Sequence, residues 1–208
     1  MIFDELDKQM RVYEQSLDQI ILPETYMVAR LDGRGFTRLT KEVCKFEAPF
    51  DVRFRDLMTK TVEALMDCGF RVVYGFTESD EISLLFAPED NAFGRKVRKY
   101  NSTLAGEASA AFSLALGQVA TFDCRVVPLP TIERVRDYFL WRQEDAHRNS
   151  LNSHCYWIIG NHEYLLGQEE YDEDLLEIIT VYKSLKDPKI KGIALEQMKL
   201  LATIHPEH

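Results

Sequence analysis

Two short acidic stretches carry the residues best suited to metal-dependent chemistry. Asp32 lies between Leu31 and Gly33, and Asp80 and Glu81 lie in a second stretch that begins at Glu78. Carboxylates from neighbouring strands can hold one or two Mg²⁺ ions, which prefer oxygen ligands and keep open positions for phosphate. Because strand side chains alternate between faces, Asp80 and Glu81 would point apart, and we favour Asp80 as the direct ligand. The alternative is that both stretches are solvated turns, since Asp, Gly and Ser are common in turns.

Two glycines follow the first acid. Gly33 and Gly35 flank Arg34. Glycine lets the backbone approach a ligand closely, and the N–H groups of such a loop can bind phosphate oxygens. A Gly-x-Gly pair alone is common, but here an acid precedes it and an arginine lies within it. This combination favours a loop that binds a nucleoside triphosphate.

The segment 91–148 is basic within an acidic chain. The net charge of the chain is −9, which argues against a protein that binds nucleic acid without regard to sequence. A local phosphate site is still possible, because the segment contains two groups of basic residues: Arg95, Lys96, Arg98 and Lys99, then Arg134, Arg136, Arg142 and Arg148. Cations at the start of a helix oppose the helix dipole, so the first group should meet an anion. Bound phosphate would be that anion if the group forms a binding site. The alternative is that these residues are ordinary solvated surface charges.

Other kinds of site have no matching pattern. The 5 histidines are not spaced as metal ligands, and no motif of a covalent nucleophile or of a Walker-type phosphate loop occurs. The 4 cysteines form no CxxC pair, which is typical of reduced cytosolic thiols. No apolar run could span a membrane, and the acidic start is unlike a secretory signal. We therefore expect a cytoplasmic protein with no membrane partner.

The elements that must position the acids alternate between strands and helices. Short apolar runs predict strands over 26–31, 70–76, 82–86 and 120–127. Helical spacing predicts helices over 2–20, 50–68 and 93–117, and from Thr131 to about Ala146. This order is that of an α+β, ferredoxin-like (split βαβ) antiparallel sheet with helices on one face. In such a sheet the strands that carry the acids lie side by side, so the acids can meet at one edge.

Three runs of residues occur together in a consistent order and spacing. They are RLDGRGF at 30–36, ESDEIS at 78–83 and DYFLWRQ at 137–143. Together they resemble the tRNA-His guanylyltransferase family and its Thg1-like relatives, which add nucleotides in the 3′-to-5′ direction. The resemblance implies a palm-type catalytic domain over residues 1–160. The remainder, residues 161–208, is predicted to be a helical C-terminal extension packed on this domain, with helices over 175–185 and 190–201. The resemblance further implies two Mg²⁺ ions, tRNA and nucleoside triphosphates as substrates, ATP or GTP for activation of the 5′ end, and a homotetramer.

The resemblance also implies roles for individual residues. Asp32, Asp80 and the Gly33 carbonyl would bind metal, and Glu81 would support catalysis. The nucleotide would contact residues of both acidic runs and of the basic helix start: Asp32, Gly33, Arg34, Gly35, Phe36, Thr37, Ser79, Asp80, Lys96 and Lys99. The segment after the third run is predicted to bind RNA through Arg142, His147, Arg148, Asn149 and Asn152.

The chain departs from the guanylyltransferases at two places. Their run His-Ile-Asn-Asn-Leu-Tyr-Asn is His-Arg-Asn-Ser-Leu-Asn-Ser at 147–153, and Thr37 stands where many members carry His. These differences favour templated nucleotide addition that repairs tRNA 5′ ends over addition of a single G to tRNA-His, which is the alternative. Two other classes are alternatives. Another palm enzyme, such as a nucleotidyl cyclase or phosphohydrolase, would use the same acids and glycines, whereas a non-catalytic RNA-binding module would bind through the sheet aromatics Tyr74 and Phe76.

Overall fold

The computed structural model describes residues 3–160, with residues 154–160 described by their backbone only. The elements are α1 (Phe3–Gln15), β1 (Tyr26–Arg34), α2 (Phe36–Arg38), the π-helix η1 (Leu39–Val43), α3 (Val52–Met66), β2 (Val72–Glu78), β3 (Glu81–Phe86), the 3₁₀ helix η2 (Ala92–Arg95), α4 (Val97–Leu116), β4 (Thr121–Leu129) and α5 (Ile132–Gly160). Within the described range, residues 3–46 and 50–139 form one compact unit, and residues 47–49 and 140–160 belong to a second. None of the helices in this range is both long and apolar enough to cross a membrane.

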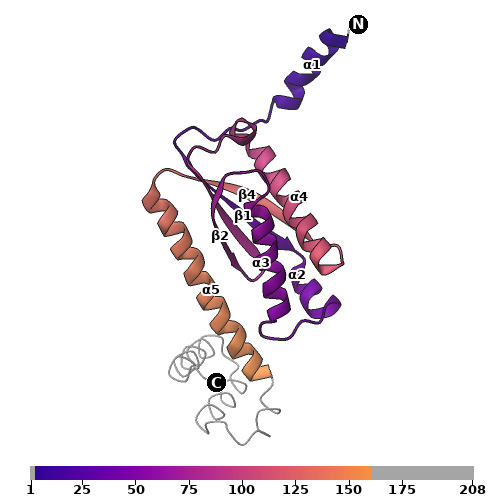
Figure 1. Ribbon diagram of the computed structural model, residues 1–208, viewed down its shortest axis with the longest axis vertical. Coiled ribbons are helices and arrows are strands. Elements are labelled where there is room, and N and C mark those ends of the chain that lie inside the picture. The colour runs from indigo at the N-terminus through magenta and orange to yellow at the C-terminus, as the bar shows by residue number, and fades with distance from the viewer. Residues whose placement is uncertain (1–2, 161–208) are drawn as a thin grey trace, which may run out of the picture. The chain divides into compact units, whose positions relative to one another are not determined.

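The four strands form one antiparallel sheet in the order β2-β3-β1-β4 (Figure 1). This is the predicted split βαβ arrangement, in which α3 connects β1 to β2 and α4 connects β3 to β4. The register places Asp32 opposite Glu81 on β3 and opposite Asp123 on β4. The sheet therefore gathers acidic residues at the end of its two central strands.

The core lies between the sheet and the helices α3 and α4. It includes Leu31 of β1, Leu84 of β3, Leu65 of α3 and Leu104 of α4, all fully buried. Burial of these apolar side chains supplies most of the driving force for folding. The two crossover helices thus cover one face of the sheet, as predicted.

The first turns of α5 lie against the other face. The Tyr138 hydroxyl is 2.9 Å from Oγ of the buried Ser83 on β3. The ring of Phe139 packs edge-on against Tyr74 of β2, with ring centroids 4.9 Å apart. The prediction that helices lie on one face therefore describes α3 and α4 but omits α5.

Several boundaries differ from the prediction. Strand β1 continues to Arg34, because Gly33 and Arg34 still pair with Phe122 and Thr121 of β4. The turn between β2 and β3 is only Ser79 and Asp80, with Ser79 in the left-handed region at φ 48°. The sequence prediction therefore assigned to turns several residues that the ladder keeps in strands.

The helix boundaries also differ. Helix α4 starts at Val97 and not at residue 93, because Phe93, Gly94 and Arg95 have φ angles of 51°, 62° and 58°. Its end at Gly117, with φ 76°, agrees with the prediction. Helix α5 begins after Thr131 as predicted, and the Arg134 N–H donates to Thr131 Oγ1 at 3.3 Å, but it continues to Gly160. The helices predicted within 161–208 lie outside the described residues.

Candidate active site

Two carboxylates meet where β1 ends and β3 begins. Asp32 lies in β1, and Asp80 lies in the turn that precedes β3. The Gly33 N–H donates a hydrogen bond to the Asp80 carbonyl at 3.0 Å, which fixes the turn against β1. The structure thus brings together Asp32, Gly33 and Asp80, the three residues predicted to bind metal.

The environment of Asp80 favours a bound cation. Burial raises the pKa of the partly buried Asp80 carboxyl, and the charge of Asp32 raises it further against the opposing effect of hydrogen bonds from its own backbone and Ser79. A carboxylate whose ionisation is disfavoured by burial and by a neighbouring acid is stabilised by a divalent cation. Among the described residues, no group of three or more His, Cys, Asp or Glu side chains could hold a metal ion. Asp32 and Asp80 offer two carboxylates, the kind of oxygen ligand that Mg²⁺ prefers.

Glu81 forms an ion pair beside these two carboxylates. Its buried side chain forms an ion pair with the Nη2 atom of Arg30. The same Nη2 atom lies 3.8 Å from Oδ2 of Asp32. The predicted alternation of side chains between the two faces of a strand does not apply to Asp80 and Glu81, because Asp80 belongs to the turn. The two side chains nevertheless have different neighbours: Glu81 faces Arg30, and Asp80 faces Asp32.

Sequence reasoning missed Arg30 as a member of this site. Arg30 and Asp32 are two residues apart on β1, so they lie on the same face of the sheet. Once the strand is extended through Asp32, the two-residue spacing places the guanidinium of Arg30 beside the acids. This spacing is visible in the sequence and could have identified Arg30.

The local structure explains why glycine occupies both positions of the predicted phosphate loop. A Cβ atom on Gly33 would lie 2.5 Å from Cδ2 of Phe36, and Gly35 has φ 72°, a conformation that favours glycine. The Phe36 ring is buried and packs against Phe54 and Phe112, so its side chain belongs to the core and not to the nucleotide contacts predicted for it. Predicted nucleotide contacts that remain exposed are Arg34, Gly35, Thr37 and Ser79.

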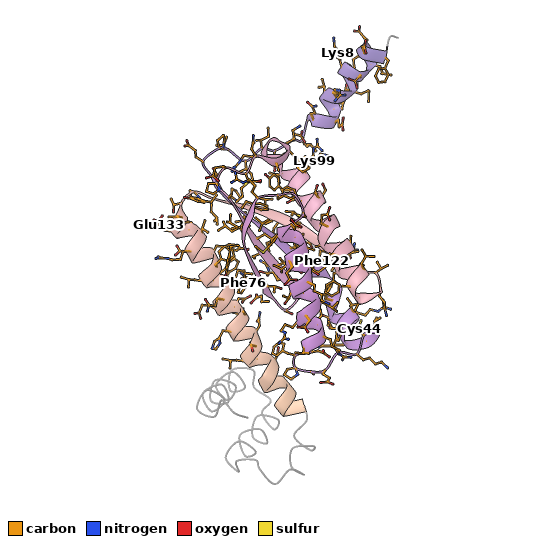
Figure 2. All side chains as sticks on the ribbon, viewed as in Figure 1. Lys8, Cys44, Phe76, Lys99, Phe122 and Glu133 are labelled. Carbon is orange, nitrogen blue, oxygen red and sulfur yellow. The ribbon has the colours of Figure 1, made fainter. Side chains whose placement is uncertain are left out.

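Lys96 and Lys99 lie at the other end of the sheet from Asp32. Arg95 Nη2 donates to the carbonyl of Thr25, the residue before β1, at 2.6 Å, so Lys96 is near the first residue of that strand. The strand from Tyr26 to Asp32 spans about 20 Å at the usual rise. Figure 2 likewise shows Lys99 far from Phe122, the β4 partner of Gly33. The structure therefore does not bring these lysines to the carboxylate pair of the same chain.

The basic start of α4 has a protein anion. Asp18 accepts from Lys96 Nζ at 2.8 Å and also pairs with Arg98. Arg95 is buried and donates to the carbonyls of Ile21, Thr25 and Asp90, while Lys99 lies over the Phe93 ring. Asp18 therefore compensates two of these four cations, Lys96 and Arg98.

The predicted RNA-binding residues differ in exposure. Arg142 is buried, with its guanidinium carbon 3.6 Å from the centroid of the Trp141 ring and Nη1 3.4 Å from Asp145. Its side chain is therefore not exposed for direct contact with RNA. Arg148 is exposed and pairs with Asp145. His147 and Asn149 are exposed, whereas Asn152 is partly buried.

The fold and the paired carboxylates define a palm-type α+β protein with a site suited to divalent cations and phosphate. Residues 7–130 match the family model described as tRNAHis guanylyltransferase. The chain therefore belongs to the tRNA-His guanylyltransferase family, as the three sequence runs predicted.

Individual relatives support this assignment. The tRNA(His) guanylyltransferase of Debaryomyces hansenii is 32% identical over 163 residues, which cover 73% of this chain and 61% of the relative. That of Schizosaccharomyces pombe is 33% identical over 158 residues, which cover 72% of this chain and 59% of the relative. The chain thus spans less than two thirds of the length of these relatives.

Solved structures show the same fold. A bacterial tRNA(His) guanylyltransferase (Thg1)-like protein in complex with GTP is 29% identical with a TM-score of 0.67, covering 72% of this chain and 69% of its own. A bacterial tRNA(His) guanylyltransferase (Thg1)-like protein in complex with ATP is 28% identical with a TM-score of 0.68. The match covers 79% of this chain and 75% of that protein's chain.

Proposed function

We propose that this chain is a nucleotidyltransferase that adds nucleotides to the 5′ end of tRNA in the 3′-to-5′ direction, templated by the opposite strand, and so repairs tRNA 5′ ends. The observation that carries the proposal is the meeting of Asp32, Gly33 and Asp80 at the end of the central strands in a member of this family. The substrates would be tRNA and nucleoside triphosphates, in the cytoplasm.

In this reaction the growing RNA end carries the leaving group. The 5′ end must first be activated, either as a triphosphate or by transfer of AMP from ATP or GMP from GTP to the 5′-phosphate, which releases pyrophosphate. The 3′-hydroxyl oxygen of the incoming nucleotide then loses its proton and bonds to the 5′ phosphorus, while the bond from that phosphorus to pyrophosphate or to the nucleoside monophosphate breaks. Two Mg²⁺ ions held by Asp32, Asp80 and the Gly33 carbonyl would acidify the hydroxyl and neutralise the leaving group. Positioning and electrostatics carry such chemistry, so no side-chain nucleophile is required.

The nucleotide would be held by residues next to the carboxylates. Arg34 and Thr37 are exposed directly after Asp32, and Ser79 precedes Asp80. The bacterial Thg1-like structures with GTP and with ATP support a triphosphate ligand for this chain. Because Lys96 and Lys99 lie about 20 Å away along β1, their proposed contact with triphosphate requires a second copy of the chain, as in a homotetramer.

The second candidate is addition of a single G to tRNA-His. The names of the curated relatives favour it, since they are tRNA(His) guanylyltransferases. The altered run at 147–153 favours repair. The two activities differ in whether a template base is needed, so one assay can separate them.

The test uses the full chain with Mg²⁺, all four nucleoside triphosphates and a 5′-triphosphorylated tRNA that lacks its first nucleotide, with products resolved on a sequencing gel. Growth that stops when the acceptor duplex is complete is the expected result. Addition of G alone, only to tRNA-His and without a template base, would replace repair by the second candidate. No growth at the 5′ end would overturn both.

Asp80→Asn tests the site itself. The substitution keeps the shape of the side chain but removes a charged metal ligand, so the rate should fall by more than about 100-fold. Asp67→Asn, at the exposed end of α3, is the matched control and should leave the rate unchanged. A folded Asp80→Asn protein with normal activity would remove Asp80 from the site.

A further inference from the structure

Arg30 forms contacts with two of the three acids at the end of the central strands. Its Nη2 atom pairs with Glu81 and lies 3.8 Å from Asp32. The side chains of Arg30 and Glu81 are 22% and 9% exposed, so the pair is largely withdrawn from water. An ion pair in such surroundings is screened little and constrains the orientation of both partners.

The guanidinium of Arg30 is paired with Glu81 through Nη2, but its Nε atom is unsatisfied within the part of the chain that the structure describes. The Nε atom of Arg30 is buried and has no hydrogen-bond partner among the described residues. A buried N–H without an acceptor is costly, and native proteins contain few of them. The guanidinium is thus oriented by its carboxylates and not by complete hydrogen bonding.

The consequence concerns Glu81. Asp32 lies directly opposite Glu81 in the sheet, and Asp80 directly precedes Glu81 in the chain. The residues that carry three carboxylates are therefore neighbours, either in the chain or across the sheet. Even so, no three acidic side chains in the described residues are arranged to hold a metal ion. Glu81 is instead paired with Arg30.

We propose that Arg30 is a positioning residue that keeps Glu81 out of the cation site formed by Asp32 and Asp80. The inference rests on the proposed function, because that function supplies the cation. A site with two carboxylates leaves coordination positions for phosphate oxygens, whereas a third carboxylate would fill one of them and hold the ion more tightly. Arg30 thereby keeps the site open for a triphosphate.

Manganese binding measures this effect without activity. The full chain is titrated with Mn²⁺ in the absence of RNA and nucleotide, and free Mn²⁺ is followed by electron paramagnetic resonance. Arg30→Met removes a positive charge and releases Glu81 toward the site, and both changes favour a cation. The Kd for Mn²⁺ should therefore fall roughly three- to ten-fold.

A double variant tests whether the tighter binding of Mn²⁺ depends on the Glu81 carboxylate. In Arg30→Met with Glu81→Gln, the charge and the third carboxylate are removed together, so the Kd should return to within about twofold of the wild-type value. Arg125→Gln is the matched control, because Arg125 lies opposite Arg30 on β4 but is exposed and is 3.8 Å from Asp123. A tightening in Arg125→Gln equal to that in Arg30→Met would show a general charge effect and overturn the proposal.

Thermal unfolding establishes that each variant is folded. Should Arg30→Met fail this check, Arg30→Leu likewise removes the charge and every hydrogen-bond donor to Glu81 and should shift the Kd in the same direction. Unchanged or weaker Mn²⁺ binding in the folded variant would overturn the inference. If the wild-type chain binds Mn²⁺ no better than Asp80→Asn, the metal site of the proposed function fails as well. Tight wild-type binding that depends on Asp80 but not on Arg30 would refute this inference alone.

Discussion

Gly33 links the acidic site to the core through its contact with Phe36. A Cβ atom at this position would lie 2.5 Å from the Phe36 ring, which is buried among Phe54, Phe112 and Phe122. The ring has little room to move, because protein interiors are close-packed. The residue that follows Asp32 must therefore lack a side chain for the core beneath the site to close.

This contact predicts the effect of Gly33→Ala. The added methyl group should overpack the core and destabilise the protein by about 1–3 kcal/mol, which lowers the Tm by roughly 3–8 °C. Gly106→Ala is the control, since nothing lies within 4 Å of its Cβ position in α4, and it should stabilise by about 0.5–1 kcal/mol. Differential scanning calorimetry compares the two variants. Equal stability of Gly33→Ala and the wild type would show that the Phe36 ring moves aside freely.

At the scale of elements, α4 begins where two segments distant in sequence are joined. The backbone of Ile20 forms a bridge with Lys96, and Asp18 accepts from Lys96 and Arg98. The left-handed residues before α4 and the buried Arg95 hold this junction in place. The segment that follows α1 is thus attached to the sheet domain through charge as well as backbone hydrogen bonds.

The junction predicts an acid-dependent stability. Hydrogen bonds from Arg98 and then Lys96 lower the pKa of Asp18 to about 2, whereas the unfolded carboxyl titrates near ~4. A depressed folded pKa contributes stability that is complete above the unfolded value and is lost as pH falls toward 2. The Tm of Asp18→Asn should therefore lie below that of the wild type above pH ~4, and the difference should shrink toward pH ~2.

Thermal melts across this pH range check the expectation. Asp7→Asn is the control, because Asp7 pairs with Arg11 within α1 and connects no two elements. Its Tm should stay near the wild-type value throughout. A difference between wild type and Asp18→Asn that is the same at every pH would exclude titration of Asp18 as the cause.

The sequence predicted the order of elements because apolar periodicity and glycine stops are local signals. Gly117 and Thr131 mark helix ends in both the sequence and the structure. The strand ends were not predictable in this way, since Gly33 and Arg34 are strand residues only through pairing with β4. The ion pair of Arg30 with Glu81 likewise depends on the register between β1 and β3, which local patterns do not define. The acids themselves were predictable, because strand order alone places Asp32 beside Asp80.

At the scale of the molecule, a chain with a net charge of −9 is proposed to bind a polyanion. Long-range attraction cannot supply that affinity, so it must come from a few exposed cations in contact with phosphates. Arg142 and Arg95 are buried, and Lys96 and Arg98 are paired with Asp18. Arg148 is exposed, although it pairs with Asp145, and it lies in the part of α5 that the sequence predicts to bind RNA.

Binding of tRNA should therefore depend on salt through a small number of contacts. Each phosphate contact contributes about 0.7–0.9 to the slope of log K against log salt concentration, so Arg148→Gln should reduce the slope by roughly that amount. Arg55→Gln on α3 is the control, since this exposed arginine pairs with Asp56 on a helix that covers the other face of the sheet from Arg30. Filter-binding titrations of tRNA at several salt concentrations give the slopes. An unchanged slope in Arg148→Gln would mean that this arginine meets no phosphate, and equal reductions in both variants would mean that binding follows net charge instead of a defined surface.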